Sequence, residues 1–410
     1  MPDHASSAVP FRTVALSSGG DGDFKVVIVG GGVAALEAAF CLKDLAGDLV
    51  STTIIAPNEE FVYVPMAVQE PFGHPLAERY PLARVAKDAG AQLCSDTFAW
   101  LESEFFIAHT TGGEQLPYDA LLLAPGASVY ANLRYTITLD PHRLDHQLHG
   151  VLQDIEGGNL HSVGFVIPDG PVWPLPIYEL ALMCAMRAHE TSADVEITIV
   201  TPEPAPLAAF GPVVAEYVAK LLTSSGITTI VSRHSTVHGP GLIAMHPAEA
   251  LHVDPMKRGE EIHADRVIGL PQLFGPHCPG VPTHSARGFI STDEHGSVPD
   301  TNRVFAAGDA TDFPIKFGGI AAQQADVAAQ SIAALAGAKI QPETFEPELR
   351  ALLLTGGRPL ILSARPSGST ATHSEVAEVP GGVSPPAKIA AEYLGPYLEE
   401  LDRSARVITS

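Results

Sequence analysis

KVVIVGGGVAALEAAF, residues 25–40, is the stretch of sequence that decides the fold. Its opening run of Val and Ile is typical of a parallel strand that is buried on both faces. Three glycines then form a tight turn, and the small residues after them suit the start of a helix. A second β-branched run follows at residues 51–56. The sequence therefore predicts a βαβ unit.

The glycine turn has the spacing of a dinucleotide-binding loop, Gly30-x-Gly32-x-x-Ala35. In such a loop the first glycine makes the turn, the second lets a pyrophosphate approach the backbone, and the small third residue lets helix and strand pack. The first N–H groups of the helix, at Val33 and Ala34, are free to bind phosphate oxygens. We therefore expect a bound dinucleotide here, and a purely structural glycine turn is the alternative.

The acidic residue that usually ends the second strand of such a unit, and holds a ribose hydroxyl, is absent from its place. Residues 56–60 read APNEE, so Asn58 and Glu59 are the candidates for the ribose contact. A solvated loop without a ligand is an equal alternative.

Composition and charge limit the class of protein. The chain has 410 residues, 46% of them hydrophobic, which is enough for two or three domain cores and excludes general disorder. A net charge of −23 disfavours nucleic acid and anionic lipid as partners, so peripheral membrane contact is not expected. The sequence has no secretory signal and no long apolar span, which predicts a cytoplasmic protein. No disulfide framework or metal site is expected from its cysteines, at positions 41, 94, 184 and 278.

A second βαβ unit is predicted between residues 162 and 200. The chain then returns to a strand at 303–307 and a helix at 320–338, which extend the first unit. The predicted fold class is α/β, with two Rossmann-like dinucleotide-binding domains, the second inserted into the first. The expected ranges are a flexible leader (1–23), the first domain (24–150 and 276–338), the second domain (151–275) and a C-terminal extension (339–410) that contains a loop (366–386).

Two further motifs resemble those of a flavoprotein family. Residues 301–310, TNRVFAAGDA, resemble the T-x-x-x-V/I-F/Y-A-x-G-D stretch of FAD-dependent oxidoreductases with two dinucleotide domains. Residues 118–127, YDALLLAPGA, resemble a second signature of that family, a strand that ends in A-T-G. Three signatures in the family's order are much more specific than any one of them.

Within this pyridine nucleotide-disulfide oxidoreductase superfamily, the chain is most similar to three groups. They are sulfide:quinone reductase, flavocytochrome c sulfide dehydrogenase and the type II NADH dehydrogenases. The resemblance covers about residues 24–338, and it implies FAD as the cofactor and a two-electron flavin reaction. The stretches that carry it are 30–39, 61–73 and 313–330.

The resemblance also assigns residues to the flavin. Asp309, which follows Gly308, takes the place of the aspartate that binds the ribityl chain. Ala124, Pro125 and Gly126 take the place of the A-T-G signature, with proline where threonine is usual. It follows that the first domain is expected to bind FAD.

Lys316 and the predicted helix start at Gly319 and Ile320 suit a role beside the flavin. A helix N-terminus aimed at the pyrimidine edge of a flavin stabilises the negative charge of the reduced form, and a lysine adds to this effect. Lys316 is therefore a catalytic candidate, and a surface lysine before a packing helix is the alternative. For Gln323 and Gln324, which resemble glutamines near quinone sites, a solvated or packed polar face is the favoured interpretation.

The second βαβ unit departs from the family in its loop, residues 167–176, IPDGPVWPLP. Its four prolines have no N–H to offer a phosphate, which makes NAD(P)H a doubtful cofactor. Glu203 still follows the next strand at the position of a ribose-binding acid. The sulfide-oxidising relatives carry a redox cysteine in this loop, where this chain has Trp173. Trp173 is a candidate wall of the substrate pocket, and packing beneath the loop is the alternative.

The sequence therefore predicts an FAD-dependent oxidoreductase that passes two electrons through the flavin without a redox-active cysteine pair. Its expected partner is a small-molecule electron donor or acceptor, such as a quinone. Two alternatives remain: an NAD(P)H dehydrogenase with an atypical nicotinamide loop, and a non-catalytic flavin-binding scaffold or redox sensor. An apolar stripe along residues 390–401 predicts a terminal helix that packs in the core or in a homodimer, kinked at Gly395-Pro396.

Overall fold

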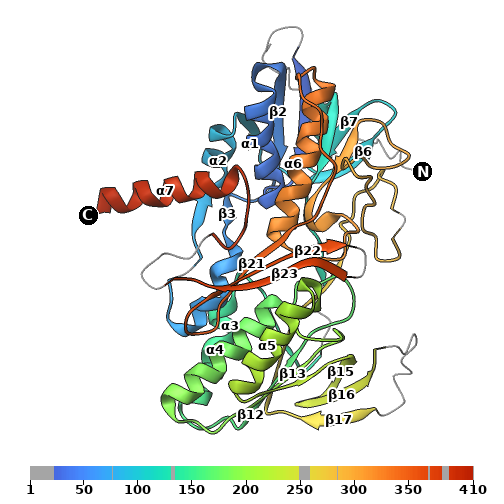
Figure 1. The fold of residues 1–410 in the computed structure, drawn as a ribbon. Helices are drawn as coiled ribbons and strands as arrows, with labels where there is room; N and C mark the ends of the chain where they lie inside the picture. Colours follow the sequence, from blue (N-terminus) through green and yellow to red (C-terminus); the bar gives the residue numbers. More distant parts are fainter. Residues whose placement is uncertain are drawn as a thin grey trace, which may run out of the picture.

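The computed structural model describes residues 23–75, 77–130, 134–248, 259–283, 285–367, 370–380 and 387–409. The expected flexible leader, except for Asp23, lies outside these residues. The described elements form two α/β domains, drawn one above the other in Figure 1, with a small sheet between them.

Five parallel strands form the sheet of the first domain, in the order β20-β9-β1-β2-β5. The predicted first strand is β1, Phe24–Val29, and the predicted helix after it is α1, Val33–Leu45. α1 packs against α6, Gly318–Leu335, and both helices are rich in buried alanine, which lets their backbones approach closely. The other strands of this sheet are β2 (Val50–Ile55), β5 (Ala91–Cys94), β9 (Ala120–Leu123) and β20 (Val304–Ala306).

The second domain repeats this design with a parallel sheet in the order β11-β18-β12-β13-β14. Its predicted strand–helix–strand unit is confirmed as β12, α4 and β13, and with it the α/β fold class with two Rossmann-type sheets. The elements of this domain are β11 (Ile137–Thr138), α3 (Leu144–Glu156), β12 (Ser162–Val166), α4 (Leu175–Thr191), β13 (Glu196–Val200), α5 (Pro212–Ser224), β14 (Ile227–Ile230) and β18 (Arg266–Gly269).

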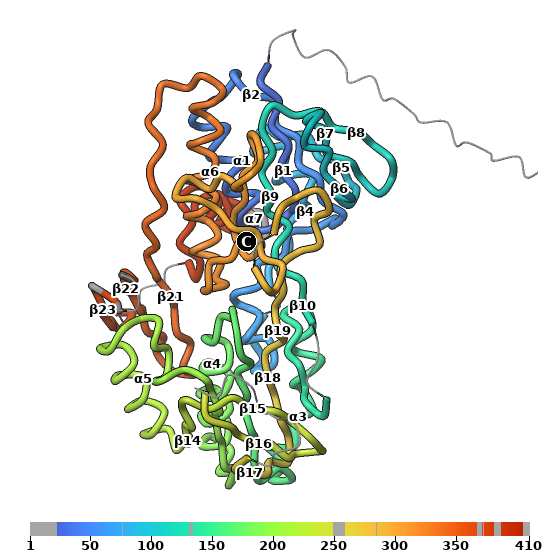
Figure 2. Tube along the Cα trace, turned by 90° about the vertical axis from the view of Figure 1, so that its right-hand side faces the viewer, coloured from blue at the N-terminus to red at the C-terminus, as the bar shows by residue number. Residues whose placement is uncertain are grey.

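The chain passes between the two domains along a pair of antiparallel strands. β10, Ser128–Tyr130, leads into the second domain, and β19, Gln272–Phe274, leads back. Figure 2 shows the two strands side by side in the narrow region between the domains. β11 already pairs with β18 of the second sheet, so the chain has entered the second domain by residue 137, ahead of the boundary expected at 150.

Short elements surround the two sheets. Those of the first domain are η1 (Gly47–Leu49), β3 (Glu60–Val62), η2 (Val64–Phe72), β4 (Arg79–Pro81), α2 (Leu82–Asp88), β6 (Phe98–Glu102), β7 (Ile107–Thr110), β8 (Gln115–Pro117) and η4 (Gly308–Ala310). Those of the second domain are η3 (Ala208–Phe210) and an antiparallel sheet of β15 (Arg233–Gly239), β16 (Leu242–Pro247) and β17 (Glu260–His263).

The C-terminal extension contributes the small sheet that lies between the domains in Figure 1. It consists of β21 (Leu349–Leu353), β22 (Leu360–Ser367) and β23 (Thr370–Glu378), paired antiparallel. The expectation of a loop over 366–386 is therefore wrong for 370–378. These residues show no regular alternation in the sequence, and they form a strand because β22 pairs with them along their length.

The last described helix, α7 (Leu394–Thr409), projects from the first domain in Figure 1 and is seen end-on in Figure 2. Its start is held by Glu37 of α1, whose carboxylate accepts hydrogen bonds from the N–H groups of Tyr393 (2.9 Å) and Leu394 (2.6 Å). Leu394 and Leu398 are buried in the core of the first domain. No kink occurs at Gly395-Pro396, because both residues lie in the first turn, where proline removes no helix hydrogen bond.

A buried ion pair joins the C-terminal extension to the second domain. Lys388 Nζ lies 2.8 Å from Glu179 Oε2 of α4, and the two side chains are 5% and 0% exposed. Lys388 Nζ also donates to the carbonyl of Pro65, in the first domain, at 2.8 Å. Leu354 N–H, which follows β21, donates to Glu179 Oε1 at 3.0 Å. One buried network therefore ties the extension to α4 and to η2, a first-domain segment that packs against α3 and α4 of the second domain.

Candidate functional site

Four loops that the sequence singled out meet at one edge of the first sheet. β1, β2, β9 and β20 run parallel, so their carboxyl ends share that edge. In doubly wound sheets ligands bind outside this edge. The fold thus gathers the expected FAD residues in one place: Gly30, Gly32, Val33, Ala34 and Ala35 after β1, Asn58 and Glu59 after β2, Ala124, Pro125 and Gly126 after β9, and Gly308 and Asp309 after β20.

The glycines after β1 have different tasks. Gly30 has a φ of +120°, and a Cβ at this position would overlap the carbonyl group of Ala124. Gly32 is the N-cap residue of α1, and a Cβ there would meet no atom within 4 Å. Gly30 is therefore required by the fold, whereas Gly32 leaves free room at the positive end of a helix. That is the shape a pyrophosphate needs, so the loop fits FAD.

The turn after β20 is fixed by a side chain of α6. Gly308 has a φ of +76°, and its N–H donates to Gln324 Oε1 at 2.8 Å. The hydroxyl of Thr311 donates to the same oxygen at 3.3 Å. A Cβ on Gly308 would lie 3.1 Å from Ala34 of α1, so the turn also packs against the glycine loop. Gln324 is buried, and its role here is to hold the turn that presents Asp309.

Half-buried Asp309 and buried Lys316 carry opposite charges and interact electrostatically behind this turn. Burial raises the pKa of Asp309, and the positive charge of Lys316 opposes that rise. Lys316 is 4% exposed, donates a hydrogen bond to the carbonyl of Thr311, and lies 4.0 Å from the centroid of the Phe289 ring. Burial lowers its pKa to about 8, although Asp309 and Asp312 oppose the change. The alternative of a surface lysine is therefore wrong.

The start of α6 lies next to Lys316. The helix begins at Gly318, so Gly319 and Ile320 are in its first turn, whose free N–H groups make a positive end. A Cβ on Gly318 would lie 2.6 Å from Cδ1 of Ile389. The N–H of Ile389 donates in turn to the hydroxyl of Tyr63 at 3.0 Å. The C-terminal extension thus covers one side of this helix start.

The other residues expected to contact FAD differ in their exposure to solvent. Asn58 and Glu59 are exposed just past β2, and the carbonyl of Glu59 accepts the N–H of Leu82 at 2.8 Å. Ala124 is buried, and Gly126 has a φ of +78°. The ribose contact proposed for Asn58 or Glu59 stays a prediction.

Comparisons with known proteins agree with this geometry. Residues 24–147 match the family model described as pyridine nucleotide-disulphide oxidoreductase. The superfamily that the sequence predicts is therefore confirmed over this segment, and members of the family are FAD-dependent oxidoreductases. A comparison with curated protein sequences finds no match.

Solved structures share the fold of this oxidoreductase at low sequence identity. The sulfide:quinone oxidoreductase of Aquifex aeolicus aligns with a TM-score of 0.77 and 18% identity, over 92% of this chain and 90% of that one. A ferredoxin reductase of Rhodopseudomonas palustris aligns with a TM-score of 0.61 and 18% identity, over 84% and 83%. NDH2 of Plasmodium falciparum aligns with a TM-score of 0.55 and 13% identity, over 70% and 64%. At these identities the likeness extends to the fold alone.

The buried lysine of this oxidoreductase gives a prediction for pH. An unfolded lysine has a pKa of about 10.4, and the folded value is about 8. Between these values the unfolded state binds more protons, so the free energy of unfolding rises with pH through this window. We expect the wild type to gain stability over Lys316→Met as pH increases from about 8 to 10. Urea unfolding of both proteins at several pH values measures the difference.

The matched control for this prediction is Lys220→Met, which removes an exposed lysine on α5. Its difference from the wild type is expected to stay constant over the same window. A constant difference for Lys316→Met as well would show that the buried ammonium group does not titrate there.

In the second domain of this oxidoreductase, the loop after β12 lacks a standard phosphate cradle. α4 begins at Leu175 with Pro174 as its cap and Pro176 in its first turn, so N–H donors are missing where a phosphate needs them. The guanidinium of Arg287 lies against Gly170, where a Cβ would overlap it, and donates to the carbonyl of Asp169 at 3.0 Å. An arginine side chain thus fills the space beside the one glycine of the loop.

Trp173 is held between aromatic rings. Its ring stacks on Phe317, the N-cap residue of α6, with centroids 4.4 Å apart and an angle of 20° between the planes. It also lies 5.8 Å from the ring of Phe210. Trp173 therefore joins the loop of the second domain to the segment that carries Lys316. It lines a cavity of about 160 Å³ together with Glu203 and Ile315.

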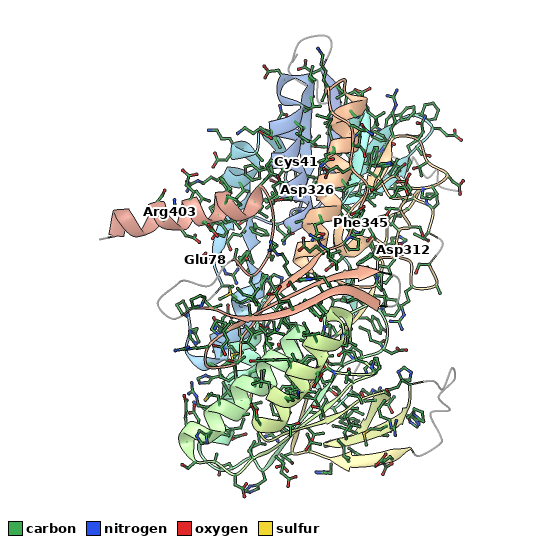
Figure 3. All side chains as sticks on the ribbon, viewed as in Figure 1. Cys41, Glu78, Asp312, Asp326, Phe345 and Arg403 are labelled. Carbon is green, nitrogen blue, oxygen red and sulfur yellow. The ribbon has the colours of Figure 1, made fainter. Side chains whose placement is uncertain are left out.

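The four cysteines of this oxidoreductase are all free thiols. Cys41 lies in α1 beside Asp326 of α6 (Figure 3). Burial raises the pKa of Cys184 to about 12 and that of Cys278 to about 11, which keeps both thiols protonated. Cys94 donates to Glu114 at 3.1 Å. The four lie in different elements, and none is in the Trp173 loop.

Among the described residues, no group of three or more His, Cys, Asp or Glu side chains is arranged to bind a metal ion. Nor does this part of the chain contain a helix with the length and apolar character needed to cross a membrane.

Several important side chains escaped the sequence reasoning. Phe289 and Arg287 come from a loop with no motif, so nothing in their neighbourhood pointed to the site. Glu179 carried a signal, because it is an acid within the apolar helix sequence LPIYELALMCAM, and a buried acid requires a partner. That partner, Lys388, could not be identified because it is 209 residues away.

Proposed function

We propose that this protein is an oxidoreductase that passes two electrons through FAD without a redox-active cysteine pair. The observation that carries the proposal is the placement of Trp173 in the loop after β12, together with four separate thiols elsewhere. A disulfide couple needs two cysteines whose Cα atoms lie within about 7 Å. Electrons from a donor would therefore pass directly to the flavin.

Different residues of this chain would bind different parts of the cofactor. Gly30 to Ala35 and the start of α1 would hold the pyrophosphate, and Asp309 would hold the ribityl chain. Bound FAD supplies the two-electron chemistry. Lys316 and the first turn of α6 provide positive charge near Asp309, which favours negative charge on a group bound there. Trp173 is our candidate for the wall of the substrate site.

A reductive titration tests the absence of a cysteine couple. We expect anaerobic dithionite to bleach the oxidised-flavin absorbance completely after two electrons per FAD. A disulfide beside the flavin would consume two more electrons as its S–S bond is reduced to two thiols. Uptake of four electrons per FAD would therefore overturn the proposal. The variant Cys184→Ala/Cys278→Ala is the control, and its titration is expected to match that of the wild type.

The reverse half-reaction separates an enzyme from a flavin-binding scaffold or sensor. Protein reduced to the end point is mixed anaerobically with a soluble quinone, and the oxidised-flavin band is followed in a stopped-flow instrument. We expect the band to return within seconds as the quinone takes two electrons and two protons to become a hydroquinone. A band that does not return would favour the scaffold.

A second candidate function, an NAD(P)H dehydrogenase, is favoured by the position of Glu203 just past β13. The prolines of the facing loop and the guanidinium of Arg287 beside Gly170 argue against it. Anaerobic addition of NADH and then NADPH tests this candidate. Persistence of the oxidised-flavin spectrum is our expected result, and rapid bleaching would establish the nicotinamide donor.

The partners and the location complete the proposal. We infer a small-molecule electron donor or acceptor, with a quinone as the leading class of acceptor, and a cytoplasmic location. A homodimer is proposed as the oligomeric state. Nucleic acid and membrane lipid are disfavoured as partners by the net charge of −23.

A further inference from the structure

A small cavity lies at the carboxyl edge of the second sheet, facing the first domain. Ile167 and the Trp173 loop follow β12, and Pro202 and Glu203 follow β13. Ile315, which precedes Lys316, closes the cavity from the other domain. Its volume is about 160 Å³. The cavity is therefore a partly open pocket lined by residues of both domains, next to the segment that carries Lys316.

The walls of this cavity are rigid and apolar. Trp173 is fixed by its stacking on Phe317 and its contact with Phe210. Pro174 and Pro202, which also line the space, have fixed φ angles. A comparable apolar cavity of about 150 Å³, engineered in another protein, holds one benzene ring. The size and the flat aromatic wall therefore suit a single six-membered ring.

Glu203 is the only ionisable side chain among the residues that line the cavity, all of which are described. Its Oε2 accepts hydrogen bonds from the hydroxyls of Tyr178 (2.6 Å) and Thr201 (3.0 Å). Tyr178 and Thr201 are themselves fully buried. Burial raises the pKa of Glu203 to about 7, and the hydrogen bonds it accepts only partly oppose the rise. The carboxyl group is thus an acceptor placed in an otherwise apolar chamber.

We propose that this cavity binds a monocyclic phenol or hydroquinone, with its ring against Trp173 and its hydroxyl group donating to Glu203. The ring fills the apolar volume, and the carboxyl group supplies the one acceptor that a hydroxyl requires. A carboxylate or phosphate ligand is disfavoured, because no lining side chain is cationic, Glu203 repels an anion, and the nearby guanidinium of Arg287 is paired with Asp169. The inference rests on the proposed function only in making the bound compound an electron donor or acceptor.

Tryptophan fluorescence tests binding directly. The chain has two tryptophans, so the variant Trp100→Phe leaves Trp173 as the only one. We expect phenol to change the emission of this holoprotein in a saturable manner. Toluene, which has the size but not the hydroxyl group, is expected to bind at least tenfold more weakly, since a hydrogen bond to a charged group contributes about 1.5–3 kcal/mol. Benzoate is expected not to bind.

Variants of Glu203 show whether the hydroxyl group is recognised there. Glu203→Leu in the Trp100→Phe background is expected to abolish the preference for phenol over toluene while toluene still binds. Glu203→Gln keeps a hydrogen-bond acceptor for Tyr178 and is expected to reduce the preference for phenol over toluene. It replaces the leucine variant if that variant does not fold. Glu216→Gln, at an exposed position on α5, is the matched control and is expected to leave the preference unchanged.

Equal binding of phenol and toluene, saturable binding of benzoate, or a preference that survives in both Glu203 variants would overturn the proposal. So would the absence of any saturable change with phenol. None of these binding results depends on turnover of the flavin. A failed binding test together with the expected dithionite titration would therefore reject the cavity while leaving the flavin function intact.

Discussion

Gly32→Ala is expected to weaken FAD binding strongly while leaving the fold of the apoprotein intact. The Cβ of the new alanine would meet no protein atom within 4 Å, and the backbone there is extended, with φ −93° and ψ −168°, which alanine adopts readily. The methyl group would instead occupy the space through which a pyrophosphate approaches the start of α1. We expect at least tenfold weaker FAD binding, a loss of roughly 1.4 kcal/mol or more.

Two measurements read out this effect separately. The ratio of flavin to protein absorbance after desalting reports retained FAD, and urea unfolding reports the stability of the apoprotein. Gly30→Ala is the contrasting variant, because its Cβ would overlap the Ala124 carbonyl at a φ of +120°, so both quantities are expected to fall. Gly150→Ala, in α3 and also facing open space, is the control that should retain FAD. Full FAD retention by Gly32→Ala would remove the glycine loop from the cofactor site.

Removal of either partner of the buried Glu179–Lys388 pair is expected to cost about 3–5 kcal/mol of the free energy of unfolding. Each single variant, Glu179→Met or Lys388→Met, leaves one charged group with almost no access to water. The double variant removes both charges and is expected to be more stable than either single one. Urea unfolding of the four proteins completes the double-mutant cycle.

The destabilisation caused by Glu179→Met is expected to depend on pH, because Lys388 titrates. Burial lowers the pKa of Lys388, and Glu179 opposes that effect in the wild type. In Glu179→Met the opposition is gone, so the lysine loses its proton at lower pH and the penalty shrinks as the pH rises. Glu216→Met/Lys220→Met removes an exposed pair on α5 and is expected to change stability far less than either buried variant. Equal losses for the buried and the exposed pair would mean that Glu179 and Lys388 do not stabilise the contact between the domains.

Features of the site that depend on local sequence could be predicted. The glycine spacing at 30–35 follows a buried strand, so its place at the sheet edge followed from the βαβ pattern. The turn that ends at Asp309 was recognised through its resemblance to a flavoprotein motif. Lys316 was a candidate because it precedes a glycine-led helix. The strands themselves were found because their apolar runs are continuous, which is typical of buried parallel strands.

Features that depend on tertiary contact could not be predicted. Gln324 of α6 accepts a hydrogen bond from Gly308 and so holds that turn. Nothing in the sequence of a helix indicates that one of its glutamines has such a role. Thr370–Glu378 forms a strand because β22 lies beside it, while its rich content of Thr and Ser and the neighbouring Pro and Gly suggested a loop. The pairing of β11 with β18 could not be predicted either, because β11 has only two residues, too few for a periodic pattern.

The path of the chain through β10 and β19 determines when the protein can take up its cofactor during synthesis. β9 ends at residue 123, but its neighbour β20 begins only at residue 304. At about 5–20 residues per second, a ribosome needs roughly 9–36 s to make the segment between them. The second domain is formed by one continuous segment and can fold during that interval. Meanwhile β9 is an edge strand without its neighbour β20. A nascent chain therefore lacks Asp309, the residue proposed to hold the ribityl chain, until three quarters of its length has been translated.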